Sequence, residues 1–172
     1  LQAEVETLRR RFEAASQLES TSSSLASERV HLVERLRQEF SERSGVLDDA
    51  IRAFSAIVEE LYVEPGQLEF HPTNNGPDIR IAIKGDRSRG IGNMEIFCFD
   101  MMLQRMCARQ KFGPGFLIHD SHLFDGVDPR QTGRALAIGA RLAEEIGFQY
   151  LVTLNSDVLS ELPADFAAAK YA

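Results

Sequence analysis

The chain has 172 residues, 44% of them hydrophobic, with a formal net charge of −7 and an isoelectric point near 5.1. This apolar content is enough for one core of ordinary size plus an extension. The negative charge argues against a uniformly basic nucleic-acid-binding surface. No apolar run reaches membrane-spanning length and no charged-then-apolar leader opens the chain, so we expect a soluble cytoplasmic protein with no membrane partner.

The N-terminal third of the chain has the periodicity of a coiled coil. Apolar residues recur in alternating steps of three and four at Val5, Leu8, Phe12 and Ala15. We therefore expect a helical arm over residues 1–62, with breaks near residues 20–24, a run of Ser and Thr, and near residues 44–45, a Ser-Gly pair. Because Leu1 is not Met and already lies inside the pattern, we expect the chain to be part of a longer protein.

Residues 63–172 are predicted to form an α/β lobe. Alternating apolar residues on either side of Thr73–Pro77 predict a β-hairpin. Further elements follow in the order loop, helix, strand, helix, strand, predicted at residues 85–93, 94–109, 116–119, 129–146 and 150–154. This order indicates a parallel α/β sheet attached to the antiparallel hairpin.

Asp120 ends the apolar strand Phe116–His119 and is the first candidate site residue. In open α/β sheets, ligands bind in the crevice beyond the carboxyl ends of the strands, and carboxylate oxygens suit Mg²⁺. We therefore expect Asp120 to be associated with a magnesium ion. The alternative is that its carboxylate only caps the following turn.

The residues around Asp120 allow a second kind of site. The cluster consists of imidazole and carboxylate groups at His119, His122, Asp125 and Asp128. These are suitable ligands for a transition metal or a two-metal hydrolase, although their spacing matches no closed zinc pattern. Asp125-Gly126 and Asp128-Pro129 also have an ordinary interpretation as a turn and a helix N-cap.

The polar loop over residues 85–93 precedes a helix. Backbone amides and the helix dipole at such a place bind phosphate oxygens. The loop is not a Walker A sequence, because no Gly-Lys-Ser or Gly-Lys-Thr occurs anywhere in the chain.

In order, the chain has a coiled-coil arm, a hairpin, a glycine-containing loop before a helix, an apolar strand ending in Asp, an acidic loop and a last strand. This order resembles the C-terminal half of the ATPase head in SMC-like and RecN-like members of the ABC ATPase superfamily. The segments Asp86–Asn93 and Phe116–Asp128 are similar to the hallmark segments of bacterial YydD-like SMC-type proteins.

The resemblance implies a role for each matching segment. Phe116–Asp120 would be the Walker B strand, with Asp120 as the magnesium-associated carboxylate. The signature loop would bind nucleotide through Ser88, Arg89, Gly90 and Gly92. Asp125–Asp128 would take the place of the D-loop, with Asp128 near the nucleotide, and Asn155 would lie in the switch region.

The sequence departs from the superfamily at the position that activates water. Most ABC ATPases have Glu directly after the Walker B Asp, whereas this chain has Ser121, so His122 or Asp125 would substitute. The implied function is ATP hydrolysis at a composite head-head interface, with ATP and Mg²⁺ bound only together with the N-terminal half of the head. This chain alone is expected to be inactive.

The implied partners are that N-terminal half, a second copy of the protein in a homodimer, and DNA through the full-length protein, in repair or defence. Two other functions stay open. The chain could be a non-catalytic coiled-coil interaction module, or a metal-dependent hydrolase that uses the His119–Asp128 cluster.

Overall fold

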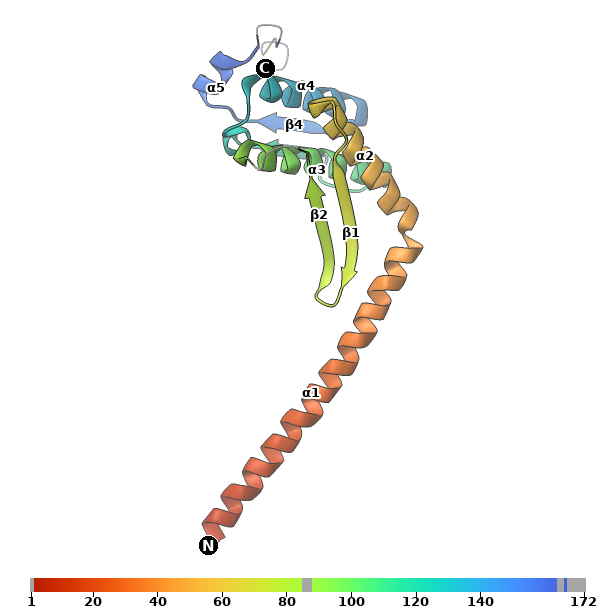
Figure 1. Cartoon of the computed structure of the whole chain (residues 1–172), viewed down its shortest axis with the longest axis vertical. Helices are drawn as coiled ribbons and strands as arrows, with labels where there is room; N and C mark the ends of the chain where they lie inside the picture. Colours follow the sequence, from red (N-terminus) through yellow and green to blue (C-terminus); the bar gives the residue numbers. More distant parts are fainter. Residues whose placement is uncertain (1, 85–87, 164–165, 167–172) are drawn as a thin grey trace. The chain divides into compact units, whose positions relative to one another are not determined.

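The computed structural model describes residues 2–84, 88–163 and 166. The chain forms two compact units: residues up to Ser44 together with His71–Asp78, and Gly45–Phe70 together with residues from Ile79 onward. The elements in chain order are α1 (Gln2–Glu42), α2 (Ser44–Tyr62), β1 (Gln67–Thr73), β2 (Gly76–Ala82), α3 (Arg89–Arg109), β3 (Phe116–His119), the 3-10 helix η1 (Ser121–Phe124), α4 (Pro129–Ile146), β4 (Gln149–Val152) and α5 (Ser156–Glu161) (Figure 1). The protein is thus of mixed α/β type, with a long N-terminal helix and two small sheets. None of the described helices is long and apolar enough to cross a lipid bilayer.

Helix α1 is continuous over 41 residues. The break predicted near residues 20–24 is wrong, because the Ser and Thr residues there remain helical. No Gly or Pro lies within Gln2–Glu42, and Ser and Thr cost only about 0.5 kcal/mol each in a helix that is already nucleated. The chain leaves the helix at Arg43, and α2 begins at Ser44.

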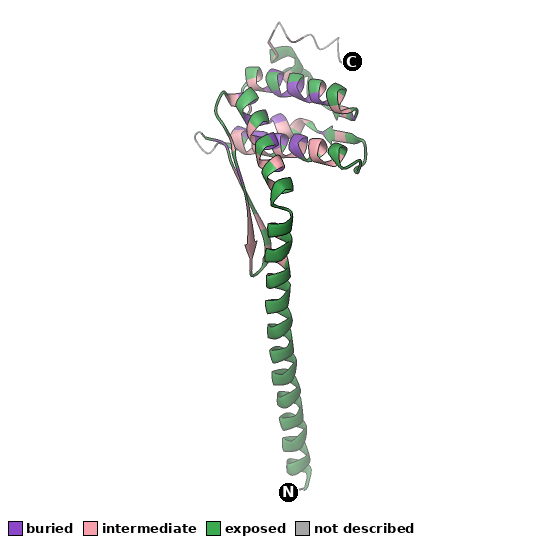
Figure 2. Ribbon diagram, turned by 90° about the vertical axis from the view of Figure 1, so that its right-hand side faces the viewer, coloured by how far each residue is buried: buried purple, intermediate pink, exposed green. Residues whose placement is uncertain are grey.

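The first unit also contains the tip of the β1–β2 hairpin. Arg29 of α1 donates from Nε to the Asn74 carbonyl oxygen at 3.2 Å and from Nη2 to Asn75 Oδ1 at 2.7 Å. Val33 and Leu36, which face the same side of α1, line a groove with the tip. No residue of α1 is buried, and Figure 2 colours almost the whole helix as exposed.

The second unit contains the core, which α2, α3 and α4 build with one face each. Helix α2 buries Ala50, Ala53, Phe54, Ile57, Val58 and Leu61. It therefore belongs with the second unit, whose first residue is Gly45.

Strands β3 and β4 form a parallel pair, with Phe116 opposite Gln149 and His119 opposite Val152. Successive side chains of a strand point to opposite faces, so Leu117 and His119 lie on the inner face. The outer face carries Phe116, Ile118 and Leu151, which are 45%, 58% and 47% exposed.

Candidate functional site

The carboxyl ends of β3 and β4 meet at one edge of the parallel pair. Asp120 follows β3 directly, and Asn155 lies three residues after the end of β4. The Thr153 amide donates to the His119 carbonyl oxygen at 3.1 Å, which extends the pairing to this edge. Both Asp120 and Asn155 are exposed, so their side chains are accessible to a ligand.

The turn after β3 is held by its own side chains. Asp120 Oδ1 accepts a hydrogen bond from the His122 amide at 3.0 Å and thereby caps η1, which begins at Ser121. His122 Nδ1 lies 3.1 Å from Asp125 Oδ2. Asp128 caps α4 by accepting from the Arg130 amide at 2.9 Å.

Helix α3 begins at Arg89, five residues before the predicted start at Met94. Ser88 is its N-cap, and the Ser88 hydroxyl accepts from the Ile91 amide at 3.3 Å. Most of the predicted phosphate-binding loop is therefore the first turn of a helix, and residues 85–87 lie outside the described residues. The two glycines in this turn hid the helix start, because glycine has low helix propensity.

Gly90 is buried because it lies against the turn after β3. A Cβ atom at this position would be 2.3 Å from the Gly126 carbonyl oxygen and 2.9 Å from its carbonyl carbon. Only glycine allows this close approach of two backbones. The start of α3 and the Asp125–Asp128 segment are thus neighbours in space.

Asn93 joins the same two segments. Its Nδ2 donates to the carbonyl oxygens of His122 at 3.1 Å and Asp125 at 3.0 Å. The Arg89 guanidinium adds an ion pair to Asp125 at 3.6 Å. The role of Asn93 was not predicted from the sequence, because nothing in the local pattern distinguishes an amide that bridges to residues about 30 positions away.

The electrostatics of this turn favour protonation of His122. The hydrogen bond to Asp125 raises the pKa of the His122 imidazole above its ordinary value, and the charges of Asp125 and Asp120 add to this effect. The nearby Arg89 opposes it. The hydrogen-bonded pair of His122 and Asp125 thus lies close to Asp120 in the sequence, and its imidazole is exposed.

The structure does not gather the predicted metal cluster. His119 points to the interior, where its ring nitrogens contact Tyr150 and Asp100, whereas His122 is paired with Asp125 at the surface. Within the described ranges 2–84, 88–163 and 166, no group of three or more His, Cys, Asp or Glu side chains is arranged to hold a metal ion.

A magnesium ion that accompanies a nucleotide is a different case. Mg²⁺ commonly takes one or two carboxylates and completes its shell with phosphate oxygens and water. The exposed Asp120 carboxylate fits this requirement, because only Oδ1 has a hydrogen bond within the turn. Magnesium bound there would neutralise charge on the phosphates.

The protein is thus a mixed α/β protein with a cluster of polar residues at the C-terminal ends of two parallel strands. Residues 57–171 match the bacterial family described as "Uncharacterised protein conserved in bacteria (DUF2326)", and the chain belongs to this family. No curated protein matches the chain.

Proposed function

We propose that this chain is the C-terminal half of an SMC-like ATPase head that acts in the bacterial cytoplasm. The observation that carries the proposal is the arrangement at one sheet edge. Asp120 follows β3 and Asn155 follows β4, and these two strands are parallel. The first turn of α3 lies against the turn that follows β3. Ligands bind at such edges in open α/β sheets.

The open face of the β3–β4 pair supports the same proposal. Parallel sheets are normally covered on both faces, and a pair of strands is marginally stable by itself. Phe116, Ile118 and Leu151 are apolar and about half exposed on the outer face. An N-terminal half of the head would cover them and extend the sheet.

In the proposed reaction, water attacks the γ-phosphate of ATP and ADP leaves. Asp120 would hold Mg²⁺, and Ser88, Arg89 and Gly92 at the start of α3 would contact phosphate across a head-head interface. Gly90 would act indirectly, because it is buried against Gly126. Asp128 and Asn155 would border the nucleotide.

The water-activating group is the feature in which this site differs most from other ABC ATPases. Ser121 is a poor base, so the hydrogen-bonded pair of His122 and Asp125 is the candidate that replaces the usual Glu. The phosphate-binding lysine would come from outside this chain, because no Walker A sequence is present.

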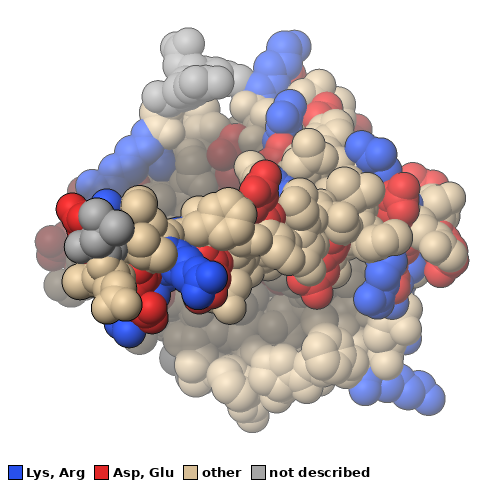
Figure 3. Space-filling view, turned by 90° about the horizontal axis from the view of Figure 1, so that it is seen from below, with Lys and Arg blue, Asp and Glu red and all other residues tan. Residues whose placement is uncertain are grey.

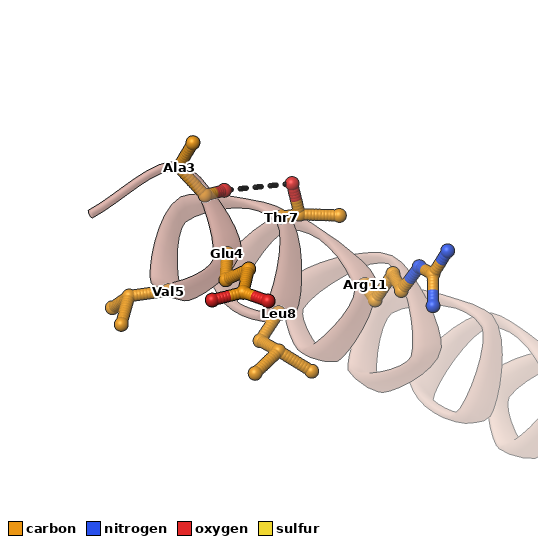
Figure 4. A pocket seen from close by; sticks show the side chains of 6 residues that line it. All are labelled: Ala3, Glu4, Val5, Thr7, Leu8 and Arg11. Carbon is orange, nitrogen blue, oxygen red and sulfur yellow. Dashed lines mark hydrogen bonds between the residues drawn. The ribbon is translucent and has the colours of Figure 1, made fainter. Parts of the chain in front are cut away.

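Helix α1 would be one strand of an antiparallel coiled coil. Val5 and Leu8 project from the same side of its first turns (Figure 4). Val5, Leu8 and Phe12 are 52%, 64% and 77% exposed, which is a large apolar surface for a lone helix. ATP-driven pairing of two heads would then move the arms and any DNA bound to them.

The negative net charge of the chain limits where DNA could bind. The chain has a net charge of −7, and basic and acidic side chains are interspersed over the face drawn in Figure 3 rather than gathered by sign. Contacts with phosphates need Lys and Arg. The proposal therefore assigns the DNA contact to the assembled protein rather than to this face.

The test is the steady-state ATPase activity of the native polypeptide. Asp120→Ala and Ser88→Arg should abolish turnover, while Asp48→Ala, which removes an exposed carboxylate from α2, should leave it unchanged. This chain alone should not hydrolyse ATP. Turnover by this chain alone, or an active Asp120→Ala protein, would contradict the proposal.

The open sheet face gives a second test. Ile118→Lys should leave this chain folded but prevent the native protein from hydrolysing ATP, because a charge on that face blocks its covering. Leu159→Lys is the matched control, since Leu159 of α5 is 48% exposed and lies outside the sheet. Equal activity of both variants would argue against a covered face.

A non-catalytic interaction module is the second candidate, and one observation favours it. Asp120 and Asp128 both cap helices, so both have a structural role without any ligand. A native protein that is folded but shows no ATPase activity would favour this function and make identification of its partner the next experiment. The separation of His119 from His122 gives the metal-dependent hydrolase no such support.

A further inference from the structure

The interior of the second unit contains a polar network that the proposed reaction does not use. His119, the last residue of β3, is only 5% exposed. Its Nδ1 lies 3.0 Å from the Tyr150 hydroxyl of β4, and its Nε2 lies 3.2 Å from Asp100 Oδ2 of α3. Phe97 packs against the imidazole, with ring centroids 5.8 Å apart.

The hydrogen-bond partners allow one tautomer in which every member of this network is satisfied. In it, His119 Nε2 donates to the Asp100 carboxylate and His119 Nδ1 accepts from the Tyr150 hydroxyl. Burial, and then the charge of Asp100, raise the pKa of Tyr150, so its hydroxyl stays protonated and available as a donor.

Helix α4 packs against this network through a glycine. Gly139 of α4 lies under the Tyr150 ring, where a Cβ atom would be 2.3 Å from Cε1 of Tyr150. Elements α3 and β4 thus contact the His119 imidazole of β3, and α4 contacts the Tyr150 ring beside it. A leucine would fill the same interior position without needing any partner, so the polar network indicates a requirement for orientation rather than for burial alone.

Three of these elements lead directly into the proposed site. Helix α3, which supplies Asp100, begins at the Ser88 cap. Strand β3 ends at His119, next to Asp120, and β4, which supplies Tyr150, leads to Asn155. The His119 carbonyl oxygen also accepts from the Thr153 amide, so both its backbone and its side chain are fixed at this edge.

We propose that His119, held between Asp100 and Tyr150, is a positioning residue that sets the location of Asp120 relative to the start of α3 and the end of β4. The inference rests on the proposed ATPase function. It predicts that loosening the network lowers the rate of the chemical step without changing how well ATP binds, because the phosphate-binding lysine would come from outside this chain.

The main experiment measures kcat and KM for ATP in the native polypeptide. Tyr150→Phe and Asp100→Asn should each lower kcat by about ten- to hundredfold and leave KM unchanged. A loss of this size is expected when a catalytic group is displaced by about one ångström. Tyr62→Phe is the matched control. The Tyr62 hydroxyl is buried without a hydrogen-bond partner among the described residues, and burial raises its pKa to about 12, so its loss should not change kcat.

A pair of substitutions separates positioning from packing. His119→Leu keeps the volume but loses both hydrogen bonds, whereas His119→Gln keeps a donor and an acceptor. We expect His119→Gln to recover much of the kcat that His119→Leu loses. Equal kcat values for the two variants would assign His119 a packing role and overturn the inference.

A second readout needs no nucleotide. The His122 amide is protected by its bond to Asp120 Oδ1, so its hydrogen exchange reports the placement of that carboxylate. Exchange at His122 should be faster in Tyr150→Phe than in Tyr62→Phe, in this chain as it stands. An inactive wild-type protein would disprove the ATPase function. An active wild-type protein with unchanged kcat and exchange in Tyr150→Phe would disprove only the positioning role.

Discussion

His119 and His122 lie three positions apart and each contacts an Asp, yet the two pairs have opposite surroundings. The side chains of His119 and Asp100 are 5% and 30% exposed, whereas those of His122 and Asp125 are 80% and 35% exposed. The interior pair joins residues 19 positions apart, and the surface pair joins residues three positions apart. The His119–Asp100 pair therefore links two elements of the tertiary structure, whereas the His122–Asp125 pair stabilises a local turn.

The strand itself explains why the two histidines separate. Side chains alternate between faces along β3, which places His119 on the inner face beside Leu117. The chain leaves the strand at Asp120, so His122 belongs to η1 and follows a different periodicity. A pair formed within a turn can rearrange when a ligand binds, whereas a pair that links α3 to β3 cannot do so without leaving buried groups unpaired.

The largest predicted effect separates the two pairs by stability. His119→Ala should destabilise the chain by about 2–4 kcal/mol, because it leaves a cavity and an unpaired Tyr150 hydroxyl. His122→Ala should shift the unfolding transition far less, since the imidazole is exposed. Urea unfolding midpoints measure both. Equal midpoint shifts would mean that the interior pair is no more structural than the surface pair.

The second prediction uses the glycine nearest to each pair. Gly139→Ala should cost about 1–3 kcal/mol, because the new Cβ would clash with the Tyr150 ring that supports the interior pair. Gly92→Ala, in the α3 turn beside the surface pair, should stabilise the chain by about 0.5–1 kcal/mol, because nothing lies within 4 Å of its Cβ. Melting temperatures of the two variants should move in opposite directions. A Gly139→Ala protein that melts no lower than the wild type would show that Tyr150 is not confined.

The two pairs also show how much of this molecule could be predicted from sequence. Strand Phe116–His119 and helix Pro129–Ile146 have the predicted bounds, since an apolar run and an Asp-Pro cap are local signals. The cap by Asp128 was foreseen for the same reason. The partners of His119 could not be foreseen, because Asp100 and Tyr150 lie on other elements and meet it only through tertiary packing.

Local signals also misled in two places. The serines of residues 20–24 suggested a break because their propensity is low, but α1 contains nothing that stops a helix. The glycines near Gly90 suggested a loop, although the Ser88 cap and the contact with Gly126 make this segment a helix start. At the start of α3 the sequence thus predicted the candidate residues but not the backbone that presents them.

The third prediction concerns what orders the surface pair. Asn93→Ala removes two hydrogen bonds to the turn and should cost about 1 kcal/mol. Hydrogen exchange should become faster at the Asp125 amide, which bonds to the His122 carbonyl oxygen. Gln104→Ala is the control, because Gln104 of α3 bonds to the Phe116 carbonyl oxygen at the other end of β3. Faster exchange at Asp125 in both variants would mean that α3 supports the turn only in a general way.

The smallest effect is a titration of the surface pair. NMR should show a His122 pKa above 6.5, and Asp125→Asn should lower it, because the hydrogen bond to Asp125 is the main cause of the shift. Since the folded pKa is raised, this pair stabilises the fold fully below the unfolded pKa of about 6.5 and loses that contribution as the pH rises through the folded pKa. Arg89→Gln should move the pKa further upward, because it removes the opposing charge. A His122 pKa that Asp125→Asn leaves unchanged would mean that the two side chains do not pair in solution.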